Sequence, residues 1–198
     1  MTSGNAESEA KIKKIMRLGI VLFTVTAITG MILGVVNEIT AEPIRRTQER
    51  LRGEALARAL PEAEEFSSVA VADNSNPIVQ SVEEGRTDGS KAGYCLTVTP
   101  SGYGGPIGIV VGITADGALR AISILSQTET PGLGAKAALP AFFEQFTNKD
   151  GARLAVVKGD AAPDQIAAIS GATITSEAVT LGVNTALDYW RDNLRGGN

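Results

Sequence analysis

The chain has 198 residues, and its 18 lysine and arginine residues against 22 aspartate and glutamate residues give a net charge of -4. This acidic balance, with an aromatic content of 5%, argues against a nucleic-acid partner, which needs a basic face and stacking side chains. With no histidine and one cysteine, Cys95, the chain cannot build a Ser-His-Asp or Cys-His catalytic unit, a structural zinc site or an iron–sulfur cluster, so redox chemistry would need an organic cofactor.

The first predicted element is a membrane-spanning helix. An uncharged, largely apolar run extends from Leu18 to Asn37. At ~1.5 Å per residue the run is ~30 Å long, the thickness of the hydrocarbon core of a bilayer. We predict a transmembrane helix over residues 15–38, preceded by a cytoplasmic tail over residues 1–14. A cleaved signal peptide is the competing interpretation, but residues 35–38 lack the small residues of a cleavage site.

The charges around this run bear on its orientation. A basic cluster before it favours a cytoplasmic N-terminus and places the rest of the chain outside the cytoplasm. Four arginines also follow the run closely, so the charge rule by itself favours neither side strongly. Within the run, Gly30 and Gly34 form a GxxxG pattern, which is typical of helix–helix contacts and is also simply common in membrane helices.

A helical stalk is expected next, over residues 39–62. Pro43 stands at the start of an amphipathic stretch that runs to Ala59, and Pro61 ends it. The remaining residues, 63–198, are expected to form one water-soluble domain. Cys95 lies in an apolar, strand-like segment of this domain and is predicted to be a small buried hydrophobe.

The water-soluble domain has the pattern of an α+β fold, with a mostly antiparallel sheet and flanking helices. Strands are expected over residues 69–71, 78–82, 94–99, 107–113, 119–125 and 154–158. Ala115-Asp116-Gly117 predicts a tight hairpin turn, because Asp-Gly suits turns that match the twist of the strands. Residues 85–90 are expected to be a loop. Helices are expected over residues 135–147 and 176–194, the second with an apolar face.

The segment with the clearest chemical content is Ile169-Ser170-Gly171-Ala172-Thr173-Ile174-Thr175-Ser176-Glu177, a loop of small residues that leads into the last predicted helix. A helix N-terminus presents unpaired N–H groups and a partial positive charge, and both favour a phosphate. Two interpretations stay open from the residues alone. The loop binds a phosphate-bearing ligand, or Thr175 or Ser176 merely caps the helix.

Part of this segment resembles a known motif. Ser170-Gly171-Ala172-Thr173 is similar to the flavinylation motif of the covalent FMN-binding domains of respiratory complexes. In that family the threonine oxygen carries FMN through a phosphoester bond, which a flavin transferase makes with FAD as donor. The resemblance implies covalent FMN on Thr173, with Ser170, Gly171 and Ala172 beside it.

Two further segments resemble the same family. Thr128-Glu129-Thr130-Pro131-Gly132-Leu133-Gly134 is similar to its loop beside the flavin, and Ser101-Gly102-Tyr103-Gly104-Gly105-Pro106-Ile107 is similar to the turn before its hairpin. The first resemblance implies these cofactor-binding residues: Glu129, Thr130, Pro131, Gly132, Leu133 and Gly134. Lys136, just beyond that loop, is either a positive charge near the flavin or an ordinary surface lysine.

The N-terminal run and residues 37–44 resemble the anchor of the G-subunit family of Rnf-type ion-translocating electron-transport complexes. The resemblance implies an electron-relay subunit of a membrane ferredoxin:NAD+ oxidoreductase, with no catalytic site and no metal ligands of its own. Its FMN domain would lie on the extracytoplasmic side of the cytoplasmic membrane. Its partners would be the other subunits, and the flavin transferase during maturation.

Two alternatives to this function stay open. The first is the related covalent-FMN subunit of the Na+-translocating NADH:quinone reductase, its C subunit, which shares the flavinylation motif. The second is a membrane-anchored binding or assembly module with no redox role.

Overall fold

A single uninterrupted helix, α1 (Ser3–Ala59), opens the chain in the computed structural model, which describes residues 3–72 and 76–196. The helix passes through Pro43, where one backbone hydrogen bond is lost. The expected anchor and stalk are therefore parts of one helix, and helical backbone already begins within the expected tail. The chain divides into two compact units, Met1–Glu49 and Arg50–Asn198.

The first unit contains a segment that is long and apolar enough to cross a membrane. Its most apolar 18-residue window has a mean hydropathy of 2.3, and none of that window is buried. The large apolar side chains from Leu18 to Val36 are more than half exposed, which is costly in water and favourable in hydrocarbon. The hydroxyls of Thr24 and Thr29 donate to carbonyl groups four residues earlier, so they are satisfied within the helix.

The second unit is built on a five-stranded antiparallel sheet in which each strand pairs with the next one along the chain. Its strands are β1 (Glu65–Val69), β2 (Val79–Thr87), β3 (Ser90–Val98), β4 (Gly108–Thr114) and β5 (Leu119–Ser126). Successive side chains alternate between the two faces, so Leu96 and Val111 enter one hydrophobic cluster while Cys95 and Val110 enter another. Both faces are therefore buried.

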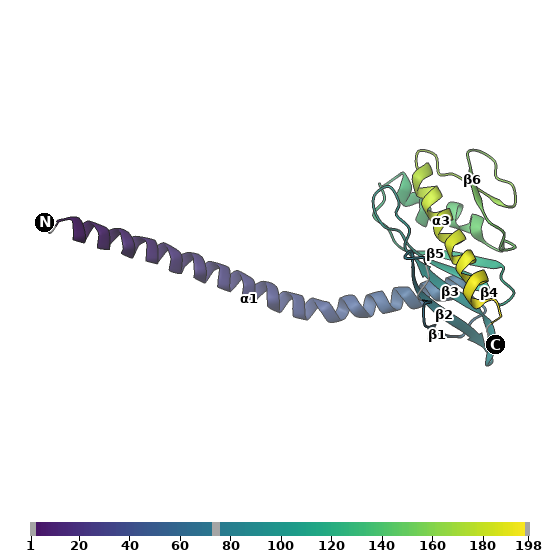
Figure 1. Ribbon diagram of the computed structural model, residues 1–198, viewed down its shortest axis with the longest axis horizontal. Coiled ribbons are helices and arrows are strands. Elements are labelled where there is room, and N and C mark those ends of the chain that lie inside the picture. Colours follow the sequence, from purple (N-terminus) through teal and green to yellow (C-terminus); the bar gives the residue numbers. More distant parts are fainter. Residues whose placement is uncertain (1–2, 73–75, 197–198) are drawn as a thin grey trace. The chain divides into compact units, whose positions relative to one another are not determined.

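Helices cover both faces of the sheet. The C-terminal helix α3 (Thr173–Tyr189) lies across one face (Figure 1) and packs its apolar side on β3 and β4. The last turns of α1 cover the other face with Leu56 and Ala59, against Cys95 and Val110. A side chain at Gly112 would collide with the Ala59 carbonyl oxygen, so this glycine lets the end of α1 rest directly on β4. The result is a helix–sheet–helix arrangement within Arg50–Asn198.

Short elements complete the unit. They are η1 (Gly134–Ala138), α2 (Pro140–Phe143), η2 (Glu144–Phe146), β6 (Ala155–Val157), β7 (Gln165–Ala167) and the π-helical turn η3 (Trp190–Leu194). β6 and β7 form a separate parallel pair. Phe142 and Phe146 meet edge to face with their ring centroids 5.6 Å apart, and both side chains are buried in the main core.

The α+β fold, the 115–117 hairpin and the strands expected over residues 94–99, 107–113 and 119–125 are confirmed, the strands as β3, β4 and β5. The expected loop over residues 85–90 is wrong, because β2 and β3 continue through it and turn at Asp88-Gly89, both in the left-handed region. The first strand is β1 rather than residues 69–71. The expected helix over residues 135–147 is broken at Leu139, because Pro140 forces the preceding residue into an extended conformation. The last helix begins at Thr173 rather than at Ser176.

Candidate cofactor-binding site

Three loops that are far apart in the sequence meet at the N-terminal end of α3. Two of them precede and follow the β4–β5 hairpin, and the third leads into α3. They enclose a cleft of about 640 Å³. The cleft is lined by Tyr103, Glu129, Thr130, Leu133, Gly134, Gly171, Ala172, Thr173, Ile174 and Thr175. The three segments that were singled out by resemblance therefore form one site.

Glu129 joins the three loops from within. Its side chain is buried, and its Oε1 accepts a hydrogen bond of 2.9 Å from the backbone N–H of Gly104. Its Oε2 accepts a 2.6 Å hydrogen bond from the hydroxyl of Thr175. A side chain at Gly102 or Gly134 would collide with one of these two carboxylate oxygens. The loops can close on the carboxylate because both neighbouring positions are glycine.

Thr173 is the first residue of α3 and lies at the edge of the cleft. The N-cap residue, Ala172, provides no side-chain hydrogen bond to the first turn, so its amide groups are left for an anion. Thr173 is partly exposed, and its hydroxyl makes no hydrogen bond within residues 3–72 and 76–196. This hydroxyl is therefore available to a ligand in the cleft.

The two hydroxyls that follow Thr173 are engaged elsewhere. The hydroxyl of Thr175 donates to Glu129. Ser176 accepts a 2.9 Å hydrogen bond from the Ile169 N–H and donates to the Ala172 carbonyl at 3.0 Å. The interpretation of Thr175 or Ser176 as the N-cap is therefore wrong, because the helix begins before both residues.

The rim of the cleft is apolar. Tyr103, Leu133 and Ile174 are 73%, 44% and 53% exposed, although large apolar side chains in this unit are otherwise mostly buried. Gly171 has a φ of +76°, and a β-carbon added there would lie 3.2 Å from Cδ2 of Leu133. The two loops thus pack closely at this point. An apolar lining with a few buried polar groups is typical of a small-molecule or cofactor site.

The predicted binding residues are not all at the cleft. Those that line it are Glu129, Thr130, Leu133, Gly134, Gly171, Ala172 and Thr173. Ser170 lines a neighbouring cavity that Thr173 shares, whereas Pro131 and Gly132 line neither of the two. Lys136 lines a different cavity, beside Phe142. Tyr103, Ile174 and Thr175 also line the cleft and are not among the predicted residues, although Tyr103 lies within one of the three motifs.

A larger cavity of about 770 Å³ lies along β5 and shares no residue with the cleft. Arg120, which lines it, already pairs with Glu62 and with the side chain of Asn148. Size alone favours this cavity. The Thr173 hydroxyl, which has no hydrogen bond within the described residues, and the uncapped N-terminus of α3 are both at the smaller cleft, which is therefore the candidate site.

Comparison with known proteins identifies the family of the domain that contains this cleft. The profile of the FMN-binding domain family matches residues 102–188, which contain every residue of the cleft. The chain is also similar in structure to the C subunit of the Na+-translocating NADH-quinone reductase of Parabacteroides distasonis, with a TM-score of 0.60 and 22% identity over 77% of this chain and 96% of that one. Fold and cleft together define an FMN-binding-domain protein.

Relatives that match nearly the whole chain narrow the class. The G subunit of the Na+-translocating ferredoxin:NAD+ oxidoreductase complex of Acetobacterium woodii is 36% identical over 194 residues, covering 91% of this chain and 93% of that protein. The G subunit of the proton-translocating complex of Clostridium ljungdahlii is 34% identical over 161 residues, covering 81% and 83%. The chain belongs to the G-subunit family of these Rnf-type ion-translocating oxidoreductase complexes.

Proposed function

We propose that this chain is the electron-relay subunit of a membrane ion-translocating ferredoxin:NAD+ oxidoreductase complex, and that it carries FMN joined through its phosphate to the hydroxyl oxygen of Thr173. The observation that carries the proposal is the position of this hydroxyl. It is free, it stands at an uncapped helix N-terminus, and it borders the cleft of an FMN-binding domain. The relatives, which are G subunits of such complexes, support the assignment to the complex.

The residues around the cleft fit FMN. The uncapped amides at the start of α3 suit the phosphate, because a helix N-terminus favours negative charge. The apolar side chains of Leu133 and Ile174 suit the face of an isoalloxazine ring. Thr175 is the next hydroxyl in the loop, but it is 1% exposed and bonded to Glu129, so it is poorly placed to accept a phosphoryl group.

Each part of the chain has a distinct role in this proposal. Bound FMN supplies one- and two-electron transfer chemistry, which the side chains of this protein do not provide. Thr173 tethers the cofactor so that it stays with the complex, and Glu129 holds the three loops around it. Other subunits deliver and remove the electrons. A flavin transferase attaches the cofactor during maturation, with FAD as donor.

We further propose a membrane topology. Residues 1–14 are the cytoplasmic tail, residues 15–38 the transmembrane helix and residues 39–62 the stalk, whose last turns pack on the sheet; residues 63–198 form the rest of the extracytoplasmic FMN domain. The basic cluster before the apolar run supports this orientation. Fusion of alkaline phosphatase to the C-terminus tests it, because that enzyme is active only outside the cytoplasm. An inactive phosphatase fusion together with a fluorescent cytoplasmic reporter fusion would reverse the topology.

The sequence identities of the relatives also bear on which of the two complexes contains this chain. The G subunits are 34–36% identical over more than four-fifths of the chain, whereas the likeness to the C subunit of the quinone reductase is at 22% identity and is one of fold. This difference supports the ferredoxin:NAD+ oxidoreductase complex. Purification from the native membrane, followed by identification of the proteins that remain attached, distinguishes the two.

The cofactor bond is tested by in-gel flavin fluorescence of the denatured chain, co-expressed with a flavin transferase. We expect fluorescence in the wild type and in Thr175→Val, and none in Thr173→Ala. Fluorescence in Thr173→Ala would place the bond on another residue. A wild-type band without fluorescence would show that the chain carries no covalent flavin, and it would favour a binding or assembly module.

A further inference from the structure

Thr173 lies between two cavities rather than one. On one side is the cleft with Glu129, Leu133 and Ile174. On the other is a cavity of about 460 Å³ that also contains Ser170, Gly171 and Lys158. A phosphate on Thr173 would therefore lie where the two cavities meet.

The two cavities together contain one negative and one positive side chain among the described residues that line them. A phosphodiester carries a full negative charge, and the cleft already contains the carboxylate of Glu129. Among the described residues that line either cavity, Lys158 is the one with a cationic side chain. Lys136, the nearest lysine to the 128–134 loop in sequence, lines a separate cavity.

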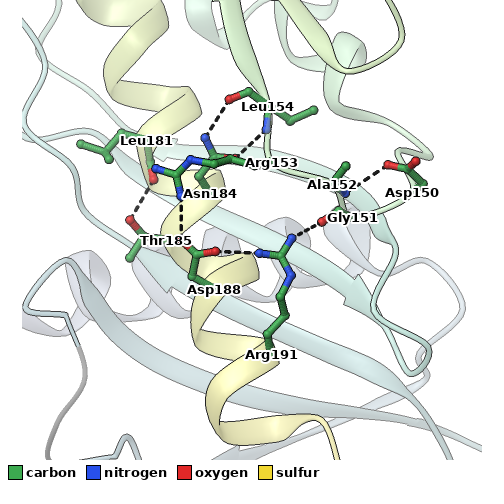
Figure 2. Close-up of polar contacts among 10 residues, drawn as sticks. All are labelled: Asp150, Gly151, Ala152, Arg153, Leu154, Leu181, Asn184, Thr185, Asp188 and Arg191. Atoms are coloured by element: carbon green, nitrogen blue, oxygen red, sulfur yellow. Dashed lines mark hydrogen bonds and ion pairs between the residues drawn. The ribbon is translucent and has the colours of Figure 1, made fainter.

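Hydrogen bonds fix the segment next to Lys158 to α3, the helix that begins with Thr173. Lys158 directly follows β6, and the Ala168 N–H donates a 2.8 Å hydrogen bond to the Val157 carbonyl just before it. At the base of β6, the Asn184 side chain of α3 donates to the Leu154 carbonyl and accepts from the Leu154 N–H, both at 2.9 Å (Figure 2). The helix that begins with Thr173 thus also fixes the strand that precedes Lys158.

The far side of the β6–β7 pair is held as well. Gln145 accepts a 2.8 Å hydrogen bond from the Ala167 N–H and donates to the Ala167 carbonyl at 3.3 Å. Two residues further on, the Ile169 N–H donates to Ser176 of α3. The segment between β6 and α3 is therefore hydrogen-bonded to α3 near both of its ends, through Leu154 and through Ile169. The Lys158 side chain itself is exposed.

We infer that Lys158 is a phosphate-positioning residue, which supplies the positive charge beside the FMN phosphate on Thr173. This inference rests on the proposed function. During attachment the Thr173 oxygen forms a bond to the flavin-side phosphorus of FAD, the bond from that phosphorus to the bridging oxygen breaks, and AMP leaves with that oxygen. The hydroxyl proton passes to a base of the transferase. Lys158 stabilises the charge on the non-bridging oxygens, and it keeps that role in the finished phosphodiester.

The test uses the full-length chain with a flavin transferase and FAD, and compares Lys158→Met, Lys158→Arg and Lys136→Met with the wild type. We expect Lys158→Met to slow flavinylation about two- to fivefold, the range for one exposed ion pair. Lys158→Arg should restore the rate, and Lys136→Met should leave it unchanged. In the finished holoprotein, the phosphorus-31 resonance of the phosphodiester should move in Lys158→Met and stay in place in Lys136→Met.

The outcomes separate the inference from the proposed function. A wild type that takes up no flavin defeats both. A wild type that is flavinylated, with Lys158→Met matching it in rate and in phosphorus resonance, overturns the role of Lys158 alone. Equal slowing by Lys158→Met and Lys136→Met also overturns it, because the effect would then come from general surface charge. Unchanged thermal unfolding of Lys158→Met is expected, since the side chain is exposed.

Discussion

The carboxylate oxygen Oε2 of Glu129 lies 2.6 Å from the hydroxyl oxygen of Thr175, and both side chains are buried. The bond joins the loop after β5 to the first turn of α3. Because the other oxygen of Glu129 accepts from Gly104, one carboxylate fixes three loops around the cleft. Removal of either hydrogen-bond donor would leave the buried carboxylate of Glu129 with an unpaired oxygen, which is costly in free energy.

Replacement of Thr175 by valine should destabilise the protein more than the same change at Thr180. Thr175→Val leaves Glu129 Oε2 without its donor, and we expect a loss of about 1–3 kcal/mol in the free energy of unfolding. Thr180→Val is the matched control on the same helix, since its hydroxyl donates only to a carbonyl within α3. Urea denaturation of the full-length chain in detergent measures both. Equal losses would mean that the bond to Glu129 contributes nothing specific.

Alanine at Gly134 should disrupt the cleft by steric collision. Its β-carbon would collide with Glu129 Oε2 and would lie 2.6 Å from the Thr175 hydroxyl oxygen. We expect a loss of roughly 1–3 kcal/mol in stability, as for other overpacked sites, and slower flavinylation. Gly53→Ala is the control of opposite sign. It lies in α1 with open space around it, so alanine should raise helix stability by roughly 1 kcal/mol.

Much of this arrangement could be predicted from the sequence. Strands β3, β4 and β5 and the 115–117 hairpin follow from alternation and from Asp-Gly, because these signals are local. The three motifs that form the cleft could be named from their resemblance to a family. The place where they meet could not be predicted from the sequence. The carboxylate of Glu129 accepts hydrogen bonds from residues 25 and 46 positions away, and no local pattern encodes such contacts.

Other features escaped prediction for physical reasons. β7 has three residues and pairs in parallel with β6, so it is too short to show an alternation. The sequence predicts a stalk over residues 39–62 but not that its last turns enter the core, where they pack on Cys95 and Val110. Amphipathic spacing predicts an apolar face without showing what that face contacts. The start of α3 at Thr173 was missed because Ala172, which has no capping side chain, occupies the N-cap.

The thiol of Cys95 should be unreactive while the protein is folded. Burial raises the pKa of this thiol well above its ordinary range, and the nearby Glu83 carboxylate raises it further. Its Sγ also lies 3.8 Å from the Leu56 carbonyl oxygen of α1. We expect labelling by a thiol reagent at pH 8 to be at least roughly 100-fold slower than in urea.

A cysteine at the exposed Ser68, in a Cys95→Ala background, is the control for this labelling and should react at once. Fast labelling of native Cys95 would mean that the last turns of α1 leave the sheet. The experiment therefore tests whether that end of the helix is a fixed part of the domain.

Glu84 should make the stability of the domain depend on pH in the acid range. Burial alone would raise the pKa of Glu84, but hydrogen bonds and charge interactions with Arg86 and Lys91 outweigh it, and the net pKa is lowered. As the pH falls, Glu84 is therefore protonated first in the unfolded chain, near a pH of about 4.3, and only at lower pH in the folded protein. The stabilisation is complete above that value and is lost as the pH falls through the lower folded pKa.

Replacement of Glu84 by glutamine should flatten this dependence. The unfolding midpoint of the wild type should fall more steeply below a pH of about 4.3 than that of Glu84→Gln. High salt should narrow the difference between the two proteins, because the pairs with Arg86 and Lys91 lie at the surface of the sheet. Parallel pH curves for the two proteins would show that Glu84 does not cause the acid sensitivity.

Asn184 should matter far more than the charged residues beside it (Figure 2). Asn184→Leu removes a buried pair of hydrogen bonds and leaves the N–H and carbonyl of Leu154 unpaired, for an expected loss of about 2–4 kcal/mol. Arg153→Met removes only an exposed ion pair with Asp188 and should cost less than about 1 kcal/mol. Hydrogen exchange across β6 and β7 should rise in the first variant and stay unchanged in the second. If instead Asn184→Leu leaves exchange in β6 unchanged, the strand pair is held to α3 by packing rather than by this side chain.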